Sequence, residues 1–329
     1  MVFFIFYKGI KPIQAPRFWY HRESFIPYVL QPLALLYKAV TLCRACFSSP
    51  IKMPVPVVCI GNIVMGGAGK TPTTLMMAEH LQSKGLHPHI LSRGYGGTFT
   101  ASTKVDPAEH DATQVGDEPL LLAKTAPTWI GKNRQQSAVL AVKNGADILL
   151  MDDGLQNEHL KKDISLLVID GNQGFGNQWV FPAGPLRETV QRGLKKADAV
   201  IFIGHDRHNI LRNIDIPVIH ATIRYKNANP KKVLAFCGLG YPQKFFLSLQ
   251  ELGYDVVDSK SFADHYPYTA QDMKSLIHKA DELKATLITT EKDLLKIPQA
   301  YHHKIEVLEM RLHLENTEIF DNLLQKMNP

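Results

Sequence analysis

Gly61-Asn62-Ile63-Val64-Met65-Gly66-Gly67-Ala68-Gly69-Lys70-Thr71-Pro72 is the stretch of this 329-residue sequence that decides the fold. Residues 57–60 before it form a short apolar run, and residues 73–82 after it carry apolar side chains at helical spacing. The predicted order is therefore strand, glycine-rich turn and helix. This order is typical of loops that bind phosphate, because the turn points main-chain N–H groups inward and the helix start adds partial positive charge.

The end of this turn indicates a nucleotide site. Lys70 is placed to reach the outer phosphates, and the Thr71 hydroxyl is a candidate ligand of Mg²⁺. The strict pattern G-x-x-x-x-G-K-[ST] is not met, because Val64 stands where its first glycine would fall. A tight turn between a strand and a helix is therefore the alternative interpretation. We predict that the nucleotide-binding residues are Gly66, Gly67, Ala68, Gly69, Lys70, Thr71 and Pro72.

A second signal lies in residues 147–154, DILLMDDG, which indicate a buried parallel strand that ends in two carboxylates. P-loop enzymes use such carboxylates to hold the water shell of Mg²⁺ opposite the loop threonine. We therefore predict that Asp152 and Asp153 form a metal site with Thr71. A solvated turn is the alternative interpretation.

The composition indicates a globular protein of two domains, since 329 residues are many for a single core. The net charge of +6 resides entirely in residues 1–56, which hold seven basic residues and Glu23 as their one acidic residue. Such a segment favours an anionic surface, either membrane or nucleic acid. Four cysteines make no disulfide framework, which fits a reducing cytosol.

The basic segment contains one amphipathic pattern, in which apolar residues recur every three to four positions from Leu33 to Phe47. Pro27 and Pro32 are expected to delay the helix start. About 15 residues then remain, too few to cross a hydrocarbon layer of about 30 Å. With its basic and aromatic flanks, the pattern favours a helix that lies in the membrane interface. An ordinary amphipathic helix packed on the first domain is the alternative.

The chain is expected to divide in the polar stretch 225–231, which contains Pro230. We predict an α/β fold of the P-loop NTPase kind, with a mostly parallel sheet flanked by helices and a second, smaller α/β domain. The last apolar-faced helix is a candidate to return to the first domain. The predicted parts are a membrane-associating segment over residues 1–53, a P-loop kinase domain over residues 54–225 and the smaller domain over residues 226–329.

Seven motifs together resemble the tetraacyldisaccharide 4′-kinase family of lipid A biosynthesis. They follow the family order from about Pro54 to Asp293: GNIVMGGAGKTP, LSRGYGG, GDEP, DDGLQ, FPAGPLRE, FADHYPY and TTEKD. The resemblance implies a peripheral kinase on the cytoplasmic face of the bacterial inner membrane that uses ATP and Mg²⁺. Its acceptor would be the 4′-hydroxyl of a tetraacylated glucosamine disaccharide 1-phosphate, with no nucleic acid and no obligate protein partner.

The resemblance also implies roles for single residues. Asp117 of GDEP corresponds to the catalytic carboxylate, supported by His265 of FADHYPY, while Lys70 acts on the phosphates. Arg134 and Arg187 correspond to arginines near the phosphates or the lipid headgroup, and so are predicted to bind substrate. The chemistry agrees, because an attacking alcohol needs a proton acceptor and a migrating phosphoryl group needs cations.

Two positions depart from the family pattern. Leu155 stands where an aromatic residue is commoner, and Asn157 stands where a histidine often follows. We expect Leu155 to be a change in packing, whereas the contact that Asn157 makes is left open.

Two other classes of function fit part of the sequence. A membrane-associated ATPase switch would use the P-loop and the amphipathic helix, but it gives no reason for His265 or for the GPLRE motif. A kinase or ATP-dependent ligase acting on a soluble small molecule would leave the basic N-terminal segment unexplained.

Overall fold

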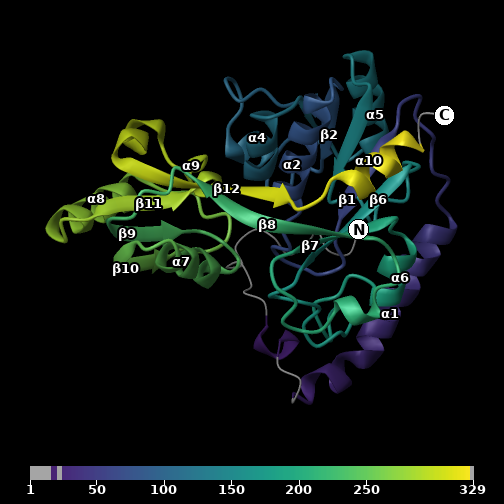
Figure 1. The fold of residues 1–329 in the computed structure, drawn as a ribbon, viewed down its shortest axis with the longest axis horizontal. Coiled ribbons are helices and arrows are strands. Elements are labelled where there is room, and N and C mark those ends of the chain that lie inside the picture. Colours follow the sequence, from purple (N-terminus) through teal and green to yellow (C-terminus); the bar gives the residue numbers. More distant parts are fainter. Residues whose placement is uncertain (1–15, 21–23, 327–329) are drawn as a thin grey trace. The chain divides into compact units, whose positions relative to one another are not determined.

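The computed structural model describes residues 16–20 and 24–326, and the chain forms two compact units. The larger unit contains Phe18–Arg224 and the chain from Met310 onward, while the smaller unit is built from Tyr225–Glu309, and Pro16 and Arg17 are also grouped with it. The smaller unit is therefore an insertion in the larger one. Each unit has a parallel sheet with helices on both faces (Figure 1).

The sheet of the larger unit is parallel except at one edge. Its strands are β1 (Val57–Gly61), β2 (Pro88–Ser92), β3 (Thr103–Lys104), β4 (Thr128–Ile130), β5 (Ile148–Asp152), β6 (Ile164–Asp170), β7 (Ala199–Ile203) and β8 (Val218–Lys226). Their order is β8-β7-β6-β1-β5-β2-β4-β3, and β3 pairs antiparallel with β4. Strand β1 pairs with β5 so that Ile60 lies opposite Asp152. This register sets the glycine-rich loop beside the acidic strand end.

The helices of the larger unit cover both faces of its sheet. They are α1 (Ile26–Cys46), α2 (Lys70–Ser83), α3 (Ala112–Val115), α4 (Asp117–Ala123), α5 (Arg134–Lys143), α6 (Val190–Lys195) and α10 (Glu318–Gln325). Val58 and Ile60 of β1 belong to one apolar core with side chains of α2, α4 and α10. Val57 and Cys59 belong to the other, with side chains of α5 and α6. This alternation explains why β1 is apolar throughout.

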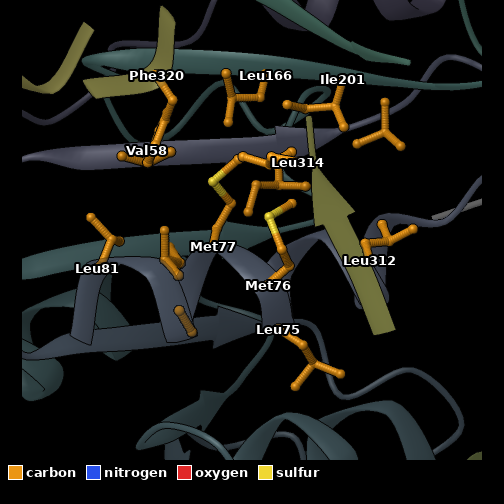
Figure 2. Packing of buried hydrophobic residues seen from close by; sticks show 14 of the residues in the cluster. Val58, Leu75, Met76, Met77, Leu81, Leu166, Ile201, Leu312, Leu314 and Phe320 are labelled. Atoms are coloured by element: carbon orange, nitrogen blue, oxygen red, sulfur yellow. The ribbon is translucent and has the colours of Figure 1, made fainter. Parts of the chain in front are cut away.

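The chain returns to the larger unit through its last elements. Strand β12 (Ile305–Leu314) crosses the boundary at Met310, and α10 follows it. Leu312 and Leu314 of β12 and Phe320 of α10 lie in the first core, close to the side chains of α2 (Figure 2). The last helix thus packs on the P-loop helix.

Helix α1 differs from the predicted helix. It begins at Ile26 and has 21 residues, with Pro27 in its first turn and Pro32 exposed inside it. The expectation that these prolines delay the helix was wrong. Helix α1 is about 31 Å long and apolar, so by length and composition alone it could cross a membrane. The argument that the helix is too short for a span was therefore also wrong.

Helix α1 contacts the rest of the larger unit through a narrow face. Tyr28 packs against Trp179 with 5.4 Å between ring centroids, and Tyr37 packs against Phe181 at 5.6 Å. Exposed apolar side chains cover much of the remaining surface: Phe25, Val29, Leu33, Leu36, Val40 and Phe47. Three of the basic residues in the predicted membrane-associating segment, Lys8, Lys11 and Arg22, lie outside the described part of the chain.

The strands of the smaller unit are parallel to one another. Its elements are β9 (Lys232–Cys237), α7 (Pro242–Glu251), β10 (Asp255–Ser261), α8 (Ala270–Glu282), β11 (Thr286–Thr290), α9 (Glu291–Leu294) and the first part of β12. The strand order is β10-β9-β11-β12, with α7 packed on one face and α8 on the other. Helix α8 begins with the predicted capping box of Thr269 and Asp272.

The predicted class of fold, a mostly parallel P-loop-type sheet with a second α/β unit, is confirmed. Strands β8 and β12 were not predicted. Strand β8 extends to Lys226, so the first residues of the expected linker 225–231 are strand. From Ile219 onward, β8 alternates between apolar residues that are buried or half-buried, such as Ala221, and polar residues such as the exposed His220 and Arg224. The period-two signal of a strand was therefore present in the sequence and was overlooked.

Candidate active site

The predicted phosphate-binding loop connects the carboxyl end of β1 to helix α2. Gly69 directly precedes the helix with a φ of 87°, and a Cβ there would lie 2.6 Å from Ile203 Cδ1. The positive φ favours glycine at this position, and a larger residue would also push the tip of the Ile203 side chain aside. A Cβ on Gly67 would meet nothing within 4 Å, so this side of the loop is open. The first N–H groups of α2 have no partner within the helix, and the loop can therefore receive an anion.

Lys70 Nζ is held between two oxygen atoms. It lies 3.2 Å from Asn62 Oδ1 and 3.7 Å from Asp153 Oδ1. Asn62 is fully buried, and its amide donates to Val64 O at 2.7 Å, which turns its acceptor oxygen toward the lysine. The sequence analysis assigned no role to Asn62, because its burial and its contact with Lys70 are seen only in the structure.

Asp152 and Asp153 occupy different electrostatic environments at the end of β5. Asp152 is 2% exposed, and its burial together with the negative charges of Glu118 and Asp153 raises its pKa to about 7. Desolvation acts in the same direction on Asp153, but the positive charges of Lys70 and Arg187 outweigh it and lower its pKa to about 2. At neutral pH Asp153 is ionised, whereas Asp152 is close to its midpoint.

Helix α2 contributes a second threonine to this region. The hydroxyl of Thr74, which is buried, donates to Asp152 Oδ1 at 2.9 Å. Thr71 is half-buried at the second position of the helix, and its role as a metal ligand stays a prediction. Thr74 was missed because its role depends on the rotation of α2 against β5, which a local motif does not contain.

The oxygen atoms gathered here suit a magnesium ion. Asp152, Asp153 and Thr71 offer carboxylate and hydroxyl oxygens, the ligands that Mg²⁺ prefers. Burial raises the pKa of Asp152 most, and the negative charges of Glu118 and Asp153, which a divalent cation would balance, raise it further. Within the described ranges, no three His, Cys, Asp or Glu side chains form a complete cage. Mg²⁺ commonly takes one or two carboxylates and completes its shell with water and phosphate oxygens.

Arg187 of the GPLRE motif faces the acidic pair. Its Nη1 donates to Asp153 Oδ1 at 2.7 Å and to Gln156 Oε1 at 3.2 Å. Gln156 in turn donates through Nε2 to Asn62 O at 2.9 Å and to Glu188 Oε1 at 3.0 Å. One glutamine thus connects the acidic strand end, the glycine-rich loop and the GPLRE motif.

The loop that carries Arg187 is fixed to the glycine-rich loop by main-chain bonds. Met65 N donates to Pro185 O at 2.8 Å, and Arg187 N donates to Ile63 O at 2.7 Å. These bonds explain why a long connection can hold an arginine in one place. A direct contact of this loop with substrate stays a prediction.

Arg134 is buried beneath the site. It is 6% exposed, and its guanidinium donates to Leu91 O and, at 3.2 Å, to Asp152 O. Burial lowers its pKa, while the charges of Asp152 and Asp153 oppose that shift. In this structure Arg134 positions the ends of β2 and β5. Its predicted contact with phosphate or headgroup stays a prediction.

Asp117 is the first residue of α4 and is 3% exposed. Its Oδ1 accepts a hydrogen bond from Glu118 N at 2.9 Å. The preceding Gly116 has a φ of 92°, and a Cβ there would lie 2.5 Å from Tyr95 O. The GDEP and RGYGG motifs therefore pack directly on each other. The charge of Glu118, the next residue of α4, contributes to the raised pKa of Asp152 after the larger effect of burial.

His265 belongs to the smaller unit and lies in the turn after β10. Its Nε2 is 3.5 Å from Lys292 Nζ and 3.8 Å from Asp264 Oδ2. The predicted catalytic residues therefore come from two units, with Lys70 and Asp117 in the larger one. Support of Asp117 by His265 stays a prediction.

The two departures from the family pattern have local structural roles. Leu155 is fully buried, and a Cβ on Gly61 would lie 2.5 Å from Leu155 Cβ. Asn157 Oδ1 accepts from the main-chain N–H groups of His159 at 3.0 Å and Leu160 at 3.3 Å. Leu155 thus packs under the strand end, and Asn157 stabilises the turn that follows it.

A parallel α/β sheet with a glycine-rich loop, a loop lysine and an acidic neighbouring strand end defines a P-loop nucleotide-binding protein. Comparison with known families narrows this class. The family model described as tetraacyldisaccharide-1-P 4′-kinase matches residues 26–328, and the chain belongs to this family.

Curated relatives and a solved structure agree with this assignment. The tetraacyldisaccharide 4′-kinase of Rhodospirillum centenum is 42% identical over 326 residues, covering 95% of this chain and 96% of its own. That of Gluconobacter oxydans is 43% identical over 307 residues, covering 91% and 93%. The crystal structure of LpxK from Aquifex aeolicus in complex with ATP matches with a TM-score of 0.77 at 26% identity, covering 92% of this chain and 99% of that one. The family resemblance predicted from the seven motifs is confirmed.

Proposed function

We propose that this chain transfers the γ-phosphate of ATP to the 4′-hydroxyl of a tetraacylated glucosamine disaccharide 1-phosphate in lipid A biosynthesis. One observation carries the proposal beyond family membership. Lys70, Asp153 and Arg187 converge beside an open glycine-rich loop, with Lys70 and Arg187 both contacting the Asp153 carboxylate. Two cations gathered at a helix start suit the oxygen atoms of a transferring phosphoryl group.

The residues divide the work of the reaction in this proposal. Lys70 and Arg187 neutralise charge on the migrating group, and the main-chain N–H groups of residues 66–71 hold phosphate oxygens. Asp117 accepts the proton of the attacking hydroxyl, with His265 as its support. When bound by Thr71, Asp152 and Asp153, Mg²⁺ supplies positive charge to the phosphate oxygens.

We infer that the protein lies on the cytoplasmic face of the inner membrane through α1. The contacts of Tyr28 with Trp179 and of Tyr37 with Phe181 tie this helix to a loop of the P-loop unit. A helix that spans the bilayer would carry this irregular loop into the hydrocarbon, where its main-chain groups would lack water. A position in the interface keeps the loop hydrated while exposed side chains such as Leu36 enter the acyl boundary.

The transfer of labelled γ-phosphate tests the proposed function. The protein is incubated with ATP and Mg²⁺, with and without a tetraacylated disaccharide 1-phosphate in mixed micelles. Label in the glycolipid at rates well above hydrolysis is expected. ATP hydrolysis that does not depend on the acceptor would instead indicate an ATPase switch, and transfer only to soluble sugars would indicate a small-molecule kinase.

A further inference from the structure

Three segments of the smaller unit meet at the carboxyl ends of its strands. Residues 237–240, CGLG, begin with the last residue of β9. Residues 262–268, FADHYPY, follow β10, and residues 289–293, TTEKD, include the end of β11. Only His265 of these segments has a role in the proposed reaction. The remaining residues surround one buried carboxylate.

Asp293 is fully buried at this junction and accepts hydrogen bonds from all three segments. Its Oδ1 accepts from Gly238 N at 3.0 Å and from the Tyr268 hydroxyl at 3.0 Å. Its Oδ2 accepts from Thr290 Oγ1 at 2.7 Å, and Lys296 Nζ lies 2.9 Å from Oδ1. Lys296 balances the carboxylate charge, and the other bonds hold the three strand ends together.

The close approach at Gly238 shows how tightly these segments fit. A Cβ at this glycine would lie 2.8 Å from Ala263 O, 3.1 Å from Asp293 Oδ1 and 3.3 Å from the Tyr268 hydroxyl. Aromatic rings close the other side, with Tyr268 packed edge-on against Phe236 of β9 at 5.5 Å between centroids. The hydroxyl of Tyr268 is therefore aimed at Asp293 by packing on both sides.

His265 lies in a strained turn within the same segment. Tyr266 N donates to Ala263 O at 3.1 Å, and His265, the third residue of this turn, has a φ of 59°. Glycine or asparagine is usual at a third position with positive φ. A histidine keeps this conformation only where its surroundings enforce it, and such strain is common at functional sites.

The element that carries Asp293 also places a cation beside the histidine. Lys292 precedes Asp293 in α9, and its Nζ lies 3.5 Å from His265 Nε2 and 3.7 Å from Asp264 Oδ1. The imidazole of His265 lies between the turn that carries it and the side chain of Lys292. The bonds of Asp293 to Gly238 and Tyr268 hold both of these segments in place.

We propose that Asp293 and Tyr268 form a clamp that positions His265 for phosphoryl transfer. The clamp is the hydrogen bond between the Tyr268 hydroxyl and the Asp293 carboxylate, together with the bond of that carboxylate to Gly238 N. Both are positioning residues, since they act through His265. This inference rests on the proposed function and on the role of His265 in it.

The FADHYPY motif offers a matched pair of variants. Tyr268→Phe removes the hydroxyl that donates to Asp293, whereas Tyr266→Phe removes a hydroxyl that donates to Asp272 Oδ2 at 3.2 Å. We expect Tyr268→Phe to lower kcat about tenfold with KM for ATP within about twofold, and Tyr266→Phe to leave kcat within about twofold. Thr290→Val, which removes another donor to Asp293, should act in the same direction as Tyr268→Phe.

A second readout follows the histidine itself. In protein labelled at histidine, the imidazole signal of His265 is assigned by NMR from its loss in His265→Gln. Tyr268→Phe should shift or broaden this signal, and Tyr266→Phe should leave it in place. A general loss of stability would lower the melting temperature of both variants, but it would not shift the His265 signal in Tyr268→Phe alone.

The outcomes separate the clamp from the proposed function. An unchanged kcat in Tyr268→Phe, with or without a change in the His265 signal, would overturn the clamp, and so would equal losses in both tyrosine variants. The kinase function would stand, because wild-type transfer is measured in the same assay. If wild type transferred no phosphate, the proposed function would fail and the His265 signal would still decide whether the clamp holds the imidazole.

Discussion

Thr74 donates its hydroxyl to Asp152 Oδ1 at 2.9 Å, and this bond joins the helix that begins with Lys70 to the acidic strand end. The bond favours the ionised form of Asp152, but burial and the neighbouring Glu118 outweigh it and raise the pKa to about 7. The charge on this carboxylate therefore changes near neutral pH.

Replacement of Asp152 by asparagine, which cannot ionise, should stabilise the metal-free protein at high pH. The unfolded carboxyl has a pKa of about 4, so between about pH 4 and 7 the folded state binds the Asp152 proton more tightly than the unfolded state. That stabilising effect is complete below about pH 4 and lost by about pH 7. Asp152→Asn keeps the acceptor for Thr74 and cannot ionise. A shift of about three pKa units corresponds to at most roughly 4 kcal/mol. We therefore expect the melting temperature of the variant to exceed that of wild type by several degrees at pH 8, with little difference at pH 4.

Thermal unfolding at both pH values, without and with Mg²⁺, provides the measurement for Asp152→Asn. Mg²⁺ should raise the melting temperature of wild type at pH 8 much more than that of the variant. A stability difference that does not depend on pH would argue against the raised pKa of Asp152.

Lys70→Ala should nearly abolish transfer. The lysine is the cation that begins α2, and main-chain N–H groups alone cannot replace its charge on the migrating phosphoryl group. We expect a loss of roughly 3 to 4 kcal/mol in transition-state stabilisation, or about two to three decades in rate. Lys124→Ala, at an exposed position after α4, is the control. A rate within about threefold of wild type would remove Lys70 from the proposed site.

Asp117 and His265 should be coupled in turnover. If His265 supports Asp117 as the base, Asp117→Ala and His265→Ala each lower kcat with little change in the affinity for ATP. The double variant should then be no slower than the slower single variant. Steady-state kinetics of the four proteins provides the cycle, and strictly additive losses would show that the two residues act independently.

The exposed face of α1 should determine membrane association. Leu36 and Val40 are 62% and 43% exposed, so Leu36→Asp combined with Val40→Asp adds charge without disturbing the core. We expect this variant to move from anionic vesicles to the soluble fraction and to show a higher KM for the glycolipid, with ATP affinity unchanged.

The control for this variant is Gln31→Asp, which adds a carboxylate at an exposed polar position of the same helix. It should still sediment with vesicles. Equal sedimentation of Leu36→Asp/Val40→Asp and wild type would show that this face does not bind the membrane.

The phosphate and metal positions could be predicted because their residues are neighbours in the sequence. Residues 66–72 form one continuous loop and helix start, and Asp152 and Asp153 end one strand. Asn62, Thr74 and Gln156 could not be assigned in the same way. Their contacts depend on how β1, β5 and α2 are set against one another, which no local pattern contains.

Arg134 and α1 illustrate two further limits. A guanidinium that is buried under a strand end and one that faces solvent have the same sequence signal, and only the fold shows that Arg134 bonds to Leu91 O. In the first turn of α1, Tyr28 packs against Trp179, which lies far along the chain. Pro32 removes one helical hydrogen bond, but it is exposed, so water can satisfy the carbonyl that it leaves free.

The insertion between Arg224 and Met310 has a consequence for folding during synthesis. Tyr225–Glu309, which makes up most of the smaller unit, is one continuous stretch, so it can begin to fold as soon as it has left the ribosome. The P-loop unit lacks Leu312, Leu314 and Phe320 of its core until the final segment emerges. The part of the protein that is translated first is thus expected to be completed last, and a nascent chain stalled before Met310 should expose the apolar surface of α2 to chaperones.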